Sequence, residues 1–339
     1  MRNNSLPHFV MMTLVIAALF FLNLSVGTIN IPLASLWDII TGGNGEPVVW
    51  RNIILKSRLP QALTATVAGA GLAISGLQMQ TVFRNPLAGP SVLGISNGAS
   101  LGVGLMVLAS GGIGGVAMSS LGIAGNAALS IGAIAGSLSV MSLIVYVAQR
   151  VKGNVTLLII GVMIGYVATA IIGVLKYFAA EEDIRAYVVW GLGSFSRVSA
   201  GQVWLFVTIM AALIPLSMLL VKTMNLLMLG EDYARNLGLN IRRARLLVIG
   251  CSGILVAIVT AYCGPVMFLG LAVPHLCRAI WRTSDHRVMM PATMLTGAAL
   301  ALACCIIARM PGFEGALPIN SVTALVGAPI VAMVLFKRK

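Results

Sequence analysis

Hydrophobic residues form long runs along the chain, and short polar segments separate them. The runs lie near residues 9–29, 61–82, 92–110, 121–148, 156–178, 202–221, 289–309 and 320–336, with one further run at 246–280. A bilayer core about 30 Å thick needs roughly 20 apolar residues in one helix. The run at 246–280 is too long for one crossing and contains Cys263-Gly264-Pro265, where Pro removes a backbone donor and Gly permits a turn. The pattern therefore predicts ten transmembrane helices.

Composition indicates the same class of protein. Of the 339 residues, 59% are hydrophobic and 9% are charged, and the mean hydropathy is +0.99. Such values are typical of an integral membrane protein, and no stretch remains for a soluble domain. The first run lacks a small-x-small cleavage pattern before Asn30, so we interpret it as a span and not as a signal peptide. We expect one all-α transmembrane domain over residues 1–339.

The distribution of Lys and Arg predicts the orientation of the helices. With the N-terminus inside, the inner loops hold 15 of the 22 basic residues. These are Arg2, Arg84, Arg150, Lys152, Lys222, Arg235, Arg242, Arg243, Arg245, Arg278, Arg282, Arg287, Lys337, Arg338 and Lys339; most acids, including Glu46 and Glu314, fall outside. Because Lys- and Arg-rich loops stay in the cytoplasm, both termini are expected there. The net charge of +13 reflects this topology and gives no reason to expect a nucleic-acid partner.

No ionisable side chain falls near the middle of a predicted span. Carriers driven by proton or sodium gradients usually need a buried carboxylate there, so a stand-alone secondary carrier is disfavoured, although backbone carbonyls can also bind sodium. The chain also lacks the G-x-x-x-x-G-K-[ST] loop that would hold ATP phosphates. Active transport would therefore need energy from a partner.

Motifs for covalent or metal chemistry are weak. Residues 94–98 read G-x-S-x-G, a hydrolase nucleophile pattern, but no strand-turn-helix context surrounds Ser96. The plausible bases, His275 and His286, lie at or beyond the inner end of a span. The cysteines lack C-x-x-C spacing and the histidines do not cluster, so we expect buried thiols and no metal site. We expect neither an enzyme nor a bound cofactor in this chain.

The segment at 84–90 predicts a helix break at the inner face. Pro86 and Pro90 cannot continue a helix, and Asn85 and Ser91 can cap the adjoining ends. Non-helical backbone at membrane depth is tolerated only where protein or a water-filled cavity covers it. We therefore interpret this segment as a bend that lines a pore.

Glycines four residues apart occur at Gly94 and Gly98, at Gly132 and Gly136, and at Gly161 and Gly165. Small residues at this spacing let helix backbones approach closely in lipid. We interpret these pairs as packing within the chain, with contact between subunits as the alternative.

The cytoplasmic stretch at 222–245 predicts a short amphipathic helix. Glu231 and Asp232 suit the positive N-terminus of a helix, and Gly238 suits its C-terminal cap. One face consists of Leu229, Tyr233 and Leu237, which recur every four residues. A helix of about two turns is marginal alone, so it either packs on its own loops or docks in a partner's groove.

Four stretches together carry a family resemblance. They are RNPLAGPSVLGISNGASLG, LGEDYARNLGLNIRRAR, GPVMFLGLAVPHLCR followed by SDHR, and LPINSVTALVGAPI. In order and spacing, from about Arg58 to Val331, they resemble the FecCD-type permease subunits of ABC importers for iron-siderophores, haem and vitamin B12. The resemblance implies the type II permease fold in the bacterial cytoplasmic membrane. It also implies a second permease copy, two ATPases that bind ATP and Mg, and an extracytoplasmic binding protein.

The resemblance assigns candidate site residues by position. Within 222–245 the ATPase-coupling residues are Leu229, Gly230, Glu231, Ala234, Arg235, Leu237 and Gly238. A cytoplasmic gate comprises Asn85, Leu87, Asn154 and Val155. Lys56, Arg58 and Arg309 fall where outer-face basic residues meet acids of the binding protein, although interfacial anchoring explains each equally well. The helix with Gly161 and Gly165 resembles the one that lines the central path of the dimer.

The sequence departs from the family pattern near the outer end of one hairpin. The family often has Ala-Asp where this chain has Cys304-Cys305, and Glu-Leu-Pro where it has Ala316-Leu317-Pro318. Because two acidic residues of the family pattern are absent here, the resemblance is a weaker basis for assigning outer-face contacts to Arg309. The expected path carries small residues and Met, so we expect selectivity to reside in the binding protein. An iron-siderophore or haem is favoured as ligand because these make up most of the family. Cobalamin is the alternative, and a homodimer is not distinguished from a pair of sister permeases.

Overall fold

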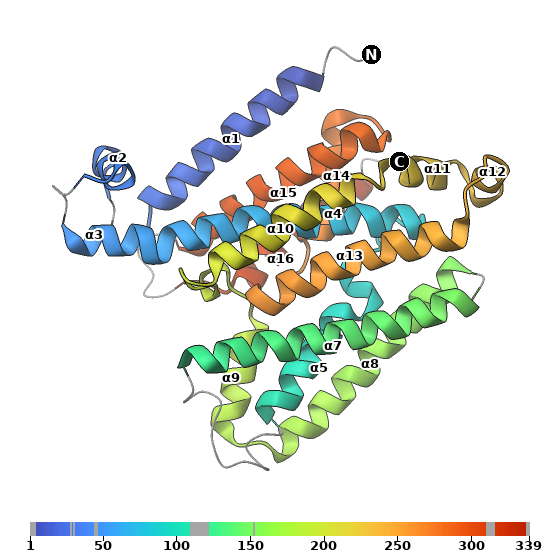
Figure 1. Ribbon diagram of the computed structural model, residues 1–339, viewed down its shortest axis with the longest axis horizontal. Coiled ribbons are helices and arrows are strands. Elements are labelled where there is room, and N and C mark those ends of the chain that lie inside the picture. The colour runs from blue at the N-terminus through green and yellow to red at the C-terminus, as the bar shows by residue number, and fades with distance from the viewer. Residues whose placement is uncertain are drawn as a thin grey trace.

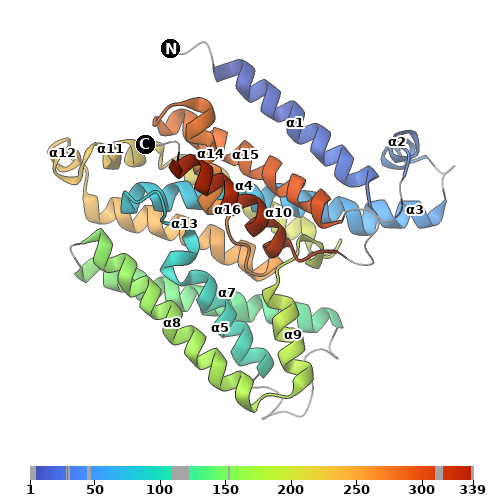
Figure 2. The same cartoon turned by 180° about the vertical axis from the view of Figure 1, so that it is seen from behind.

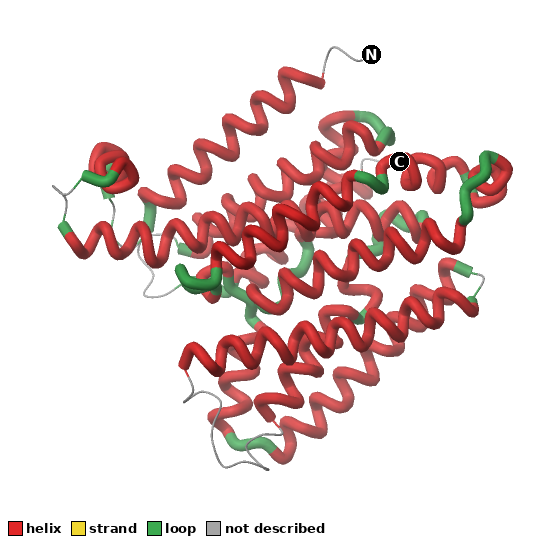
Figure 3. Tube along the Cα trace, in the orientation of Figure 1, coloured by secondary structure: helices red, strands yellow, loops and turns green. Residues whose placement is uncertain are grey.

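The computed structural model describes residues 5–27, 29, 31–43, 47–108, 122–151, 153–309 and 316–336. Within these ranges the chain forms helices joined by loops, and no strand occurs (Figure 3). The predicted all-α class is confirmed. The orientation prediction also used Arg2, Glu46, Lys152, Glu314 and residues 337–339, which lie outside the described ranges.

Each predicted apolar run contains a helix. The helices are α1 (Ser5–Ser25), α4 (Leu59–Phe83), α5 (Ile95–Leu108), α7 (Gly122–Arg150), α8 (Asn154–Phe178), α10 (Val203–Met218), α13 (Ile241–Cys263), α14 (Leu269–Trp281), α15 (His286–Ala308) and α16 (Ile319–Phe336). The expected break in the long run is confirmed, because α13 ends at Cys263 and Gly264 adopts a φ of 75°.

Within the described ranges, six helices are long and apolar enough to cross a membrane. A seventh results if α10 and α11 (Val221–Leu229), which are bent by 44°, form one span. The apolar helices α5, α14 and α16 are shorter. At about 1.5 Å per residue, α5 and α14 are each shorter than a bilayer core is thick. Ten crossings therefore stays a prediction.

Shorter helices lie between the long ones. They are α2 (Leu33–Thr41), α3 (Val48–Ile53), the π-helical turn η1 (Ile54–Arg58), the 3₁₀ turns η2 (Pro90–Leu93) and η4 (Phe195–Arg197), α9 (Glu181–Gly191) and α12 (Glu231–Asn236). Helices α2 and α3 lie at one end of the molecule, and α12 lies at the opposite end (Figure 1). Helix α16 ends toward the α12 end (Figure 2).

Helix α4 forms the centre of the larger helix group, where α10, α13, α14 and α15 pack against it. A second group consists of α5, α7, α8 and α9, and α13 contacts both α5 and α7 (Figures 1 and 2). Helix α13 therefore packs against helices of both groups. This arrangement places η2, which follows the predicted pore-lining bend, between α4 and α8.

Close helix contacts depend on glycine at several crossings. A Cβ atom on Gly136 of α7 would overlap the carbonyl oxygen of Gly98 on α5. Likewise, a Cβ atom on Gly102 would overlap the carbonyl oxygen of Gly132. Packing within the chain is therefore confirmed, but the α5 partners are Gly98 and Gly102. Gly94 instead adopts a φ of 73° before α5 begins.

Two arginines hold the C-terminal end of α1. Arg58 is only 4% exposed, and its Nη1 donates to the carbonyl oxygens of Leu24 at 2.8 Å and Ser25 at 2.7 Å. Its Nη2 donates to the carbonyl oxygen of Ile29. Arg309 donates to the side-chain oxygen of Asn23 at 2.5 Å. These bonds satisfy carbonyl groups that the end of a helix leaves unpaired.

The position of Arg58 corrects its predicted role. A buried guanidinium that bonds three carbonyl groups of its own chain cannot reach a carboxylate on a binding protein. Arg309 is half-buried and also bonds inward, whereas Lys56 is exposed. The docking role stays a prediction for Lys56 and for the remaining exposed surface of Arg309.

We expect Arg58→Ala to lower the thermal stability of the protein in detergent. Only 11% of the apolar window of α1 is buried, so the helix depends on few other contacts. Hydrogen bonds to charged groups contribute roughly 1.5–3 kcal/mol each and are not additive, which gives a loss of about 3 kcal/mol. The measurement is the Tm by thermal unfolding. Lys56→Ala is the control, because this neighbour is exposed; equal Tm values for the two variants would contradict the assignment.

Candidate functional site

The predicted inner bend lies between α4 and η2. Arg84 ends α4 with a φ of 48°, and the side-chain oxygen of Asn85 accepts a hydrogen bond from the backbone N–H of Leu87 at 2.9 Å. The N–H of Ala88 donates to the carbonyl oxygen of Asn85 at 3.0 Å. Asn85 thus closes the turn with both its side chain and its backbone. The predicted helix break is confirmed, with Asn85 as the residue that shapes it.

His275 on α14 holds the same segment from the other side. Its ring is buried, and Nε2 lies 2.8 Å from the carbonyl oxygen of Pro86. Because a carbonyl oxygen only accepts, this bond assigns a proton to Nε2. His275 therefore positions the bend and is not directed at Ser96. The motif GLAVPH marked this histidine in the sequence, but its partner became known only from the structure.

A second helical break, at residues 264–268, meets the first in one cavity. The cavity has a volume of about 140 Å³. Its lining comprises Leu87, Gly89, Ser91, Val92 and Ser96 from the first break and its surroundings, Val266, Met267, Phe268, Gly270 and Leu271 from the second, and Leu72 and Val256 from α4 and α13. Both non-helical segments line this cavity, and non-helical backbone at membrane depth is tolerated where it is covered by protein or lines a cavity. The two breaks therefore form the walls of one possible path.

Helix α16 supports the second break. The N–H of Met267 donates to the side-chain oxygen of Asn320 at 3.0 Å. Phe268 has a φ of 66°, which is unusual for an aromatic residue. Its Cβ lies where a side chain on Gly327 would be, so only glycine leaves room for it. Asn320 and Gly327 both belong to the motif LPINSVTALVGAPI, and their contacts give that motif a physical role.

The second half of the expected gate lies at the start of α8. Val155 is 72% exposed there, and Leu87 is also exposed. The described hydrogen bonds of Asn85 and Leu87 stay within their own turn and do not include Val155. The backbone of Asn154 begins α8, and its side chain lies outside the described part of the chain. A gate that uses both halves stays a prediction.

Gly161 and Gly165 face the interior of the chain. A Cβ atom on Gly161 would lie 2.9 Å from the Cα of Leu93, and one on Gly165 would lie 2.5 Å from the side chain of Asn97. These glycines therefore pack α8 against η2 and α5, and the expectation that α8 lines the central path of a dimer stays a prediction. The exposed large apolar residues of α8 are Val155, Ile159, Met163, Tyr166, Val167, Ile171, Val174, Tyr177 and Phe178.

The expected coupling helix is present as α12, with six residues. Gly230 precedes it with a φ of 118°, and Gly238 follows it with a φ of 87°. The N–H of Gly238 donates to the carbonyl oxygen of Arg235 at 2.9 Å. Ala234 is fully buried, so this residue anchors the helix to the protein. The predicted start and end of the helix are confirmed, but the predicted face is wrong in one respect: Leu229 belongs to α11, and Gly230 separates it from α12.

The apolar face of this segment is turned outward. Leu229, Tyr233 and Leu237 are each more than half exposed. Glu231 forms an ion pair with Arg245 of α13, which fixes the start of α12 against the membrane domain. A cytoplasmic helix that packed on its own loops would bury this face. The exposure favours the second interpretation, docking in a partner's groove.

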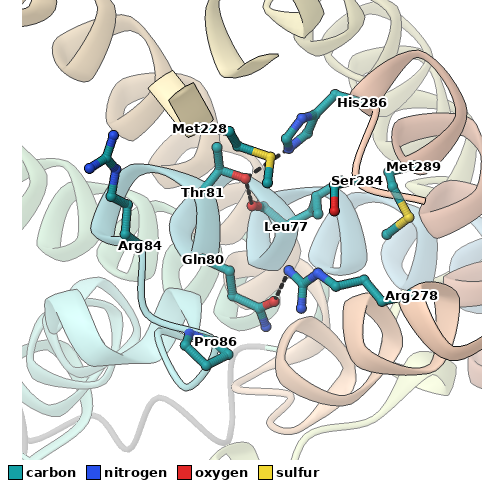
Figure 4. A pocket seen from close by; sticks show the side chains of 10 residues that line it. All are labelled: Leu77, Gln80, Thr81, Arg84, Pro86, Met228, Arg278, Ser284, His286 and Met289. Carbon is teal, nitrogen blue, oxygen red and sulfur yellow. Dashed lines mark hydrogen bonds between the residues drawn. The ribbon is translucent and has the colours of Figure 1, made fainter. Parts of the chain in front are cut away.

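A larger cavity of about 330 Å³ lies at the inner end of α4 (Figure 4). It is lined by Leu77, Gln80, Thr81, Arg84, Pro86, Met228, Arg278, Ser284, His286 and Met289. Arg278 on α14 donates to the side-chain oxygen of Gln80 at 2.6 Å. Arg84 donates to the carbonyl oxygen of Leu227 on α11 at 2.8 Å. The cavity is thus lined both by Pro86 of the gate segment and by Met228 of α11, the helix that leads into α12.

In the described ranges, no three His, Cys, Asp or Glu side chains lie close enough together to hold a metal ion. Four of the five cysteines are buried thiols, as expected, and Cys251 is half-buried.

Comparison with known proteins gives matches over nearly the whole chain. The model of the FecCD transport family matches residues 14–337. The Hemin transport system permease protein HmuU of Yersinia pestis is 33% identical over 332 residues, which cover 98% of this chain and 95% of that protein. The Vitamin B12 import system permease protein BtuC of Citrobacter koseri is 38% identical over 299 residues, covering 87% and 84%.

A solved structure has the same fold. It is described as an inward-facing conformation of a candidate metal-chelate type ABC transporter. It matches with a TM-score of 0.83 and 28% sequence identity, covering 98% of this chain and 99% of that chain.

Proposed function

This chain belongs to the FecCD transport family, and from that premise we propose that it conducts a large metal chelate into the cytoplasm when a partner ATPase hydrolyses ATP. The family consists of permease subunits of ABC importers, so the chain is a transport subunit and not itself an enzyme. It is a multi-pass membrane protein of a bacterial importer. We propose that it lies in the bacterial cytoplasmic membrane.

The outward apolar face of α12 carries the proposal of an ATPase partner. Tyr233 of α12 is exposed, as are the residues on either side of this short helix, Leu229 at the end of α11 and Leu237 at the C-cap. Six residues are too few for a helix that is stable alone, and Ala234 and Glu231 hold the other side of α12. Since the sequence has no phosphate-binding loop, nucleotide would bind to the partner. Docking there would transmit ATP-driven motion into α11 and α13, which flank α12.

The two helical breaks support a path through the chain. Their shared cavity is lined mostly by apolar and small side chains and has no charged group among its lining residues. Such a surface suits a large ligand that makes few specific contacts during passage. The exposed apolar face of α8 would meet a second copy of the permease in a homodimer, with the path at the two-fold axis. An extracytoplasmic binding protein would deliver the ligand near Lys56.

The ligand class is a chelate of the siderophore, haem or cobalamin type. Similar relatives are named for hemin and for vitamin B12, which supports haem and cobalamin equally. The preference for an iron-siderophore rests on the composition of the family alone. We therefore propose this class of ligand, and uptake measurements with each chelate will identify which one the transporter carries.

We expect gentle purification from native membranes to recover an ATPase in fixed ratio with this chain. Proteoliposomes that contain the complex should accumulate labelled ferric siderophore, haem or cobalamin only when ATP is supplied to the ATPase side. The measurement is uptake of each ligand in turn, with empty liposomes as the control. Full uptake by the permease without an ATPase would overturn the proposal in favour of a secondary carrier.

A further inference from the structure

Three helices meet around His286 at the inner end of the molecule. His286 is the first residue of α15 and is 2% exposed. Thr81, in the last turn of α4, is also buried, and Asn225 lies on α11. Figure 4 shows the ring of His286 directed at the hydroxyl of Thr81. The proposed function assigns no role to this contact.

Hydrogen bonds join the three helices through the side chain of His286. Nε2 lies 2.8 Å from the hydroxyl oxygen of Thr81. Nδ1 lies 2.8 Å from the side-chain oxygen of Asn225, which also accepts the backbone N–H of His286 at 2.9 Å. Each ring nitrogen therefore bonds a different helix, and the ring bridges α4 and α11.

Asp285 fixes the orientation of the Asn225 amide. The side-chain nitrogen of Asn225 donates to Oδ1 of Asp285 at 2.7 Å, and the backbone N–H of Arg287 donates to the same oxygen at 2.9 Å. These donors lower the pKa of the Asp285 carboxyl below its usual value, so at neutral pH it only accepts hydrogen bonds. The amide oxygen of Asn225 must then face His286, which assigns a proton to Nδ1. Nε2 then accepts from Thr81 when the single hydroxyl hydrogen of Thr81 turns from its other acceptor, the carbonyl oxygen of Leu77 at 2.8 Å.

Both ends of this bridge lie next to the elements that must move together. Asn225 is on α11, which continues through Gly230 into the coupling helix α12. Thr81 is one turn before the Asn85 turn of the gate segment. A second bond, from Arg84 to the carbonyl oxygen of Leu227, joins the same two helices at 2.8 Å. A displacement of α11 would therefore reach the end of α4 through short, directional contacts.

The surroundings favour a rigid connection. The charged groups near His286 are Asp285, which bonds Asn225, and Arg278, which bonds Gln80 of α4 across the cavity. Buried hydrogen bonds with fixed donors and acceptors hold one geometry, and loss of one partner leaves the other unsatisfied. The N-cap bond of Asp285 already satisfies the start of α15, so capping alone does not explain the ring contact with α4.

We propose that His286 is a positioning residue that couples the motion of the ATPase-docking helix to the cytoplasmic gate, by linking Asn225 on α11 to Thr81 on α4. The inference rests on the proposed function and adds the connection between its two moving parts. His286 touches neither ligand nor ATPase, and it acts through the ends of α11 and α4.

The test compares transport with ATP hydrolysis in the complete transporter, reconstituted with its ATPase and binding protein. His286→Ala should lower the number of ligand molecules transported per ATP by about fivefold, with ATP hydrolysis retained, because a fivefold change corresponds to a coupling free energy of about 1 kcal/mol, which is typical of such contacts. His286→Gln should restore most of the ratio, since its amide can donate to Asn225 and accept from Thr81.

Thr81→Val tests the same link from the other helix and should lower the ratio in the same direction. If the His286→Ala transporter fails to assemble, the ratio measured for Thr81→Val still tests the proposal. Thr64→Val is the matched control, because Thr64 is a buried threonine of α4 whose hydroxyl has no hydrogen-bond partner in the described part of the chain.

The outcomes separate the inference from the proposed function. An unchanged transport-to-ATP ratio in His286→Ala and Thr81→Val overturns the link. So does a proportional fall of transport, hydrolysis and Tm, which would indicate a merely structural role. If the wild-type complex itself shows no ATP-dependent uptake, the proposed function fails, whatever the variants do.

Discussion

Replacing Gly238 with Pro is expected to abolish transport while the membrane helices stay folded. Gly238 has a φ of 87°, and its N–H donates to the carbonyl oxygen of Arg235 at 2.9 Å. Proline fixes φ near about −65° and has no N–H, so both features are lost. The chain would then leave α12 in another direction, and the face formed by Tyr233 and Leu237 would no longer match the groove of a partner.

The effect should be local because Gly238 lies on the surface. A Cβ atom added at this position meets no atom within 4 Å, so Gly238→Ala tests backbone strain alone. That strain amounts to about 1–2 kcal/mol for a non-glycine residue in the left-handed region. We expect the Ala variant to retain part of its uptake and the Pro variant to have none.

The measurements are ligand uptake, recovery of the ATPase on purification, and the Tm of the isolated permease. Loss of uptake and of ATPase binding at an unchanged Tm is the expected result for Gly238→Pro. Normal uptake by this variant would remove the reason to regard α12 as the coupling helix.

The local features of the fold were predictable because they depend on neighbouring residues. Apolar runs gave the helices, Gly264 and Pro265 gave the break after α13, and the spacing of Glu231 and Gly238 gave the ends of α12. Each signal lies within a few residues of the structure it produces, so no knowledge of the tertiary fold is needed.

Features that depend on distant segments were not predictable. Arg58 was expected to face a binding protein, yet it bonds the end of α1, more than 30 residues earlier in the chain. Gly161 was expected on a helix that lines a central path, and the structure shows that the glycine itself packs against Leu93. A glycine pattern shows that a helix is closely packed and does not show against which neighbour.

The candidate site was predicted only in part, because its contacts also join segments that are distant in the sequence. The motifs marked Asn85, His275 and Asn320, but their partners lie on other helices: His275 bonds the carbonyl of Pro86, and Asn320 bonds the N–H of Met267. The bridge from Thr81 through His286 to Asn225 joins residues up to 205 positions apart. Sequence spacing alone carries no signal for such a contact.

Gly76→Ala is the second substitution with a large expected effect, because it inserts a methyl group where α4 crosses α14. A Cβ atom on Gly76 would lie 2.6 Å from the Cα of Gly270 and would overlap its carbonyl oxygen. Backbone atoms cannot rotate away as a side chain does, so the two helices must separate. We expect a net loss of about 1–3 kcal/mol from overpacking, reduced by up to about 1 kcal/mol because Ala favours helix over Gly.

The functional effect should exceed the effect on stability. Gly270 and Leu271 line the cavity between the two helical breaks, and Leu72 lines it one turn away from Gly76 on α4. Separating α4 from α14 would change the shape of this cavity. His275, on the same face of α14, would shift relative to Pro86. We expect uptake to fall by at least about tenfold, since small displacements in closely packed elements are transmitted to neighbouring sites.

Gly250→Ala on α13 is the matched control for this prediction. Gly250 also lies within a helix, but an added Cβ atom meets nothing within 4 Å. The control should keep its uptake and have an equal or slightly higher Tm, because only the helix preference of Ala acts there. If Gly76→Ala matched Gly250→Ala in both Tm and uptake, the crossing of α4 and α14 would not set the cavity. The path would then have to lie outside the two helical breaks.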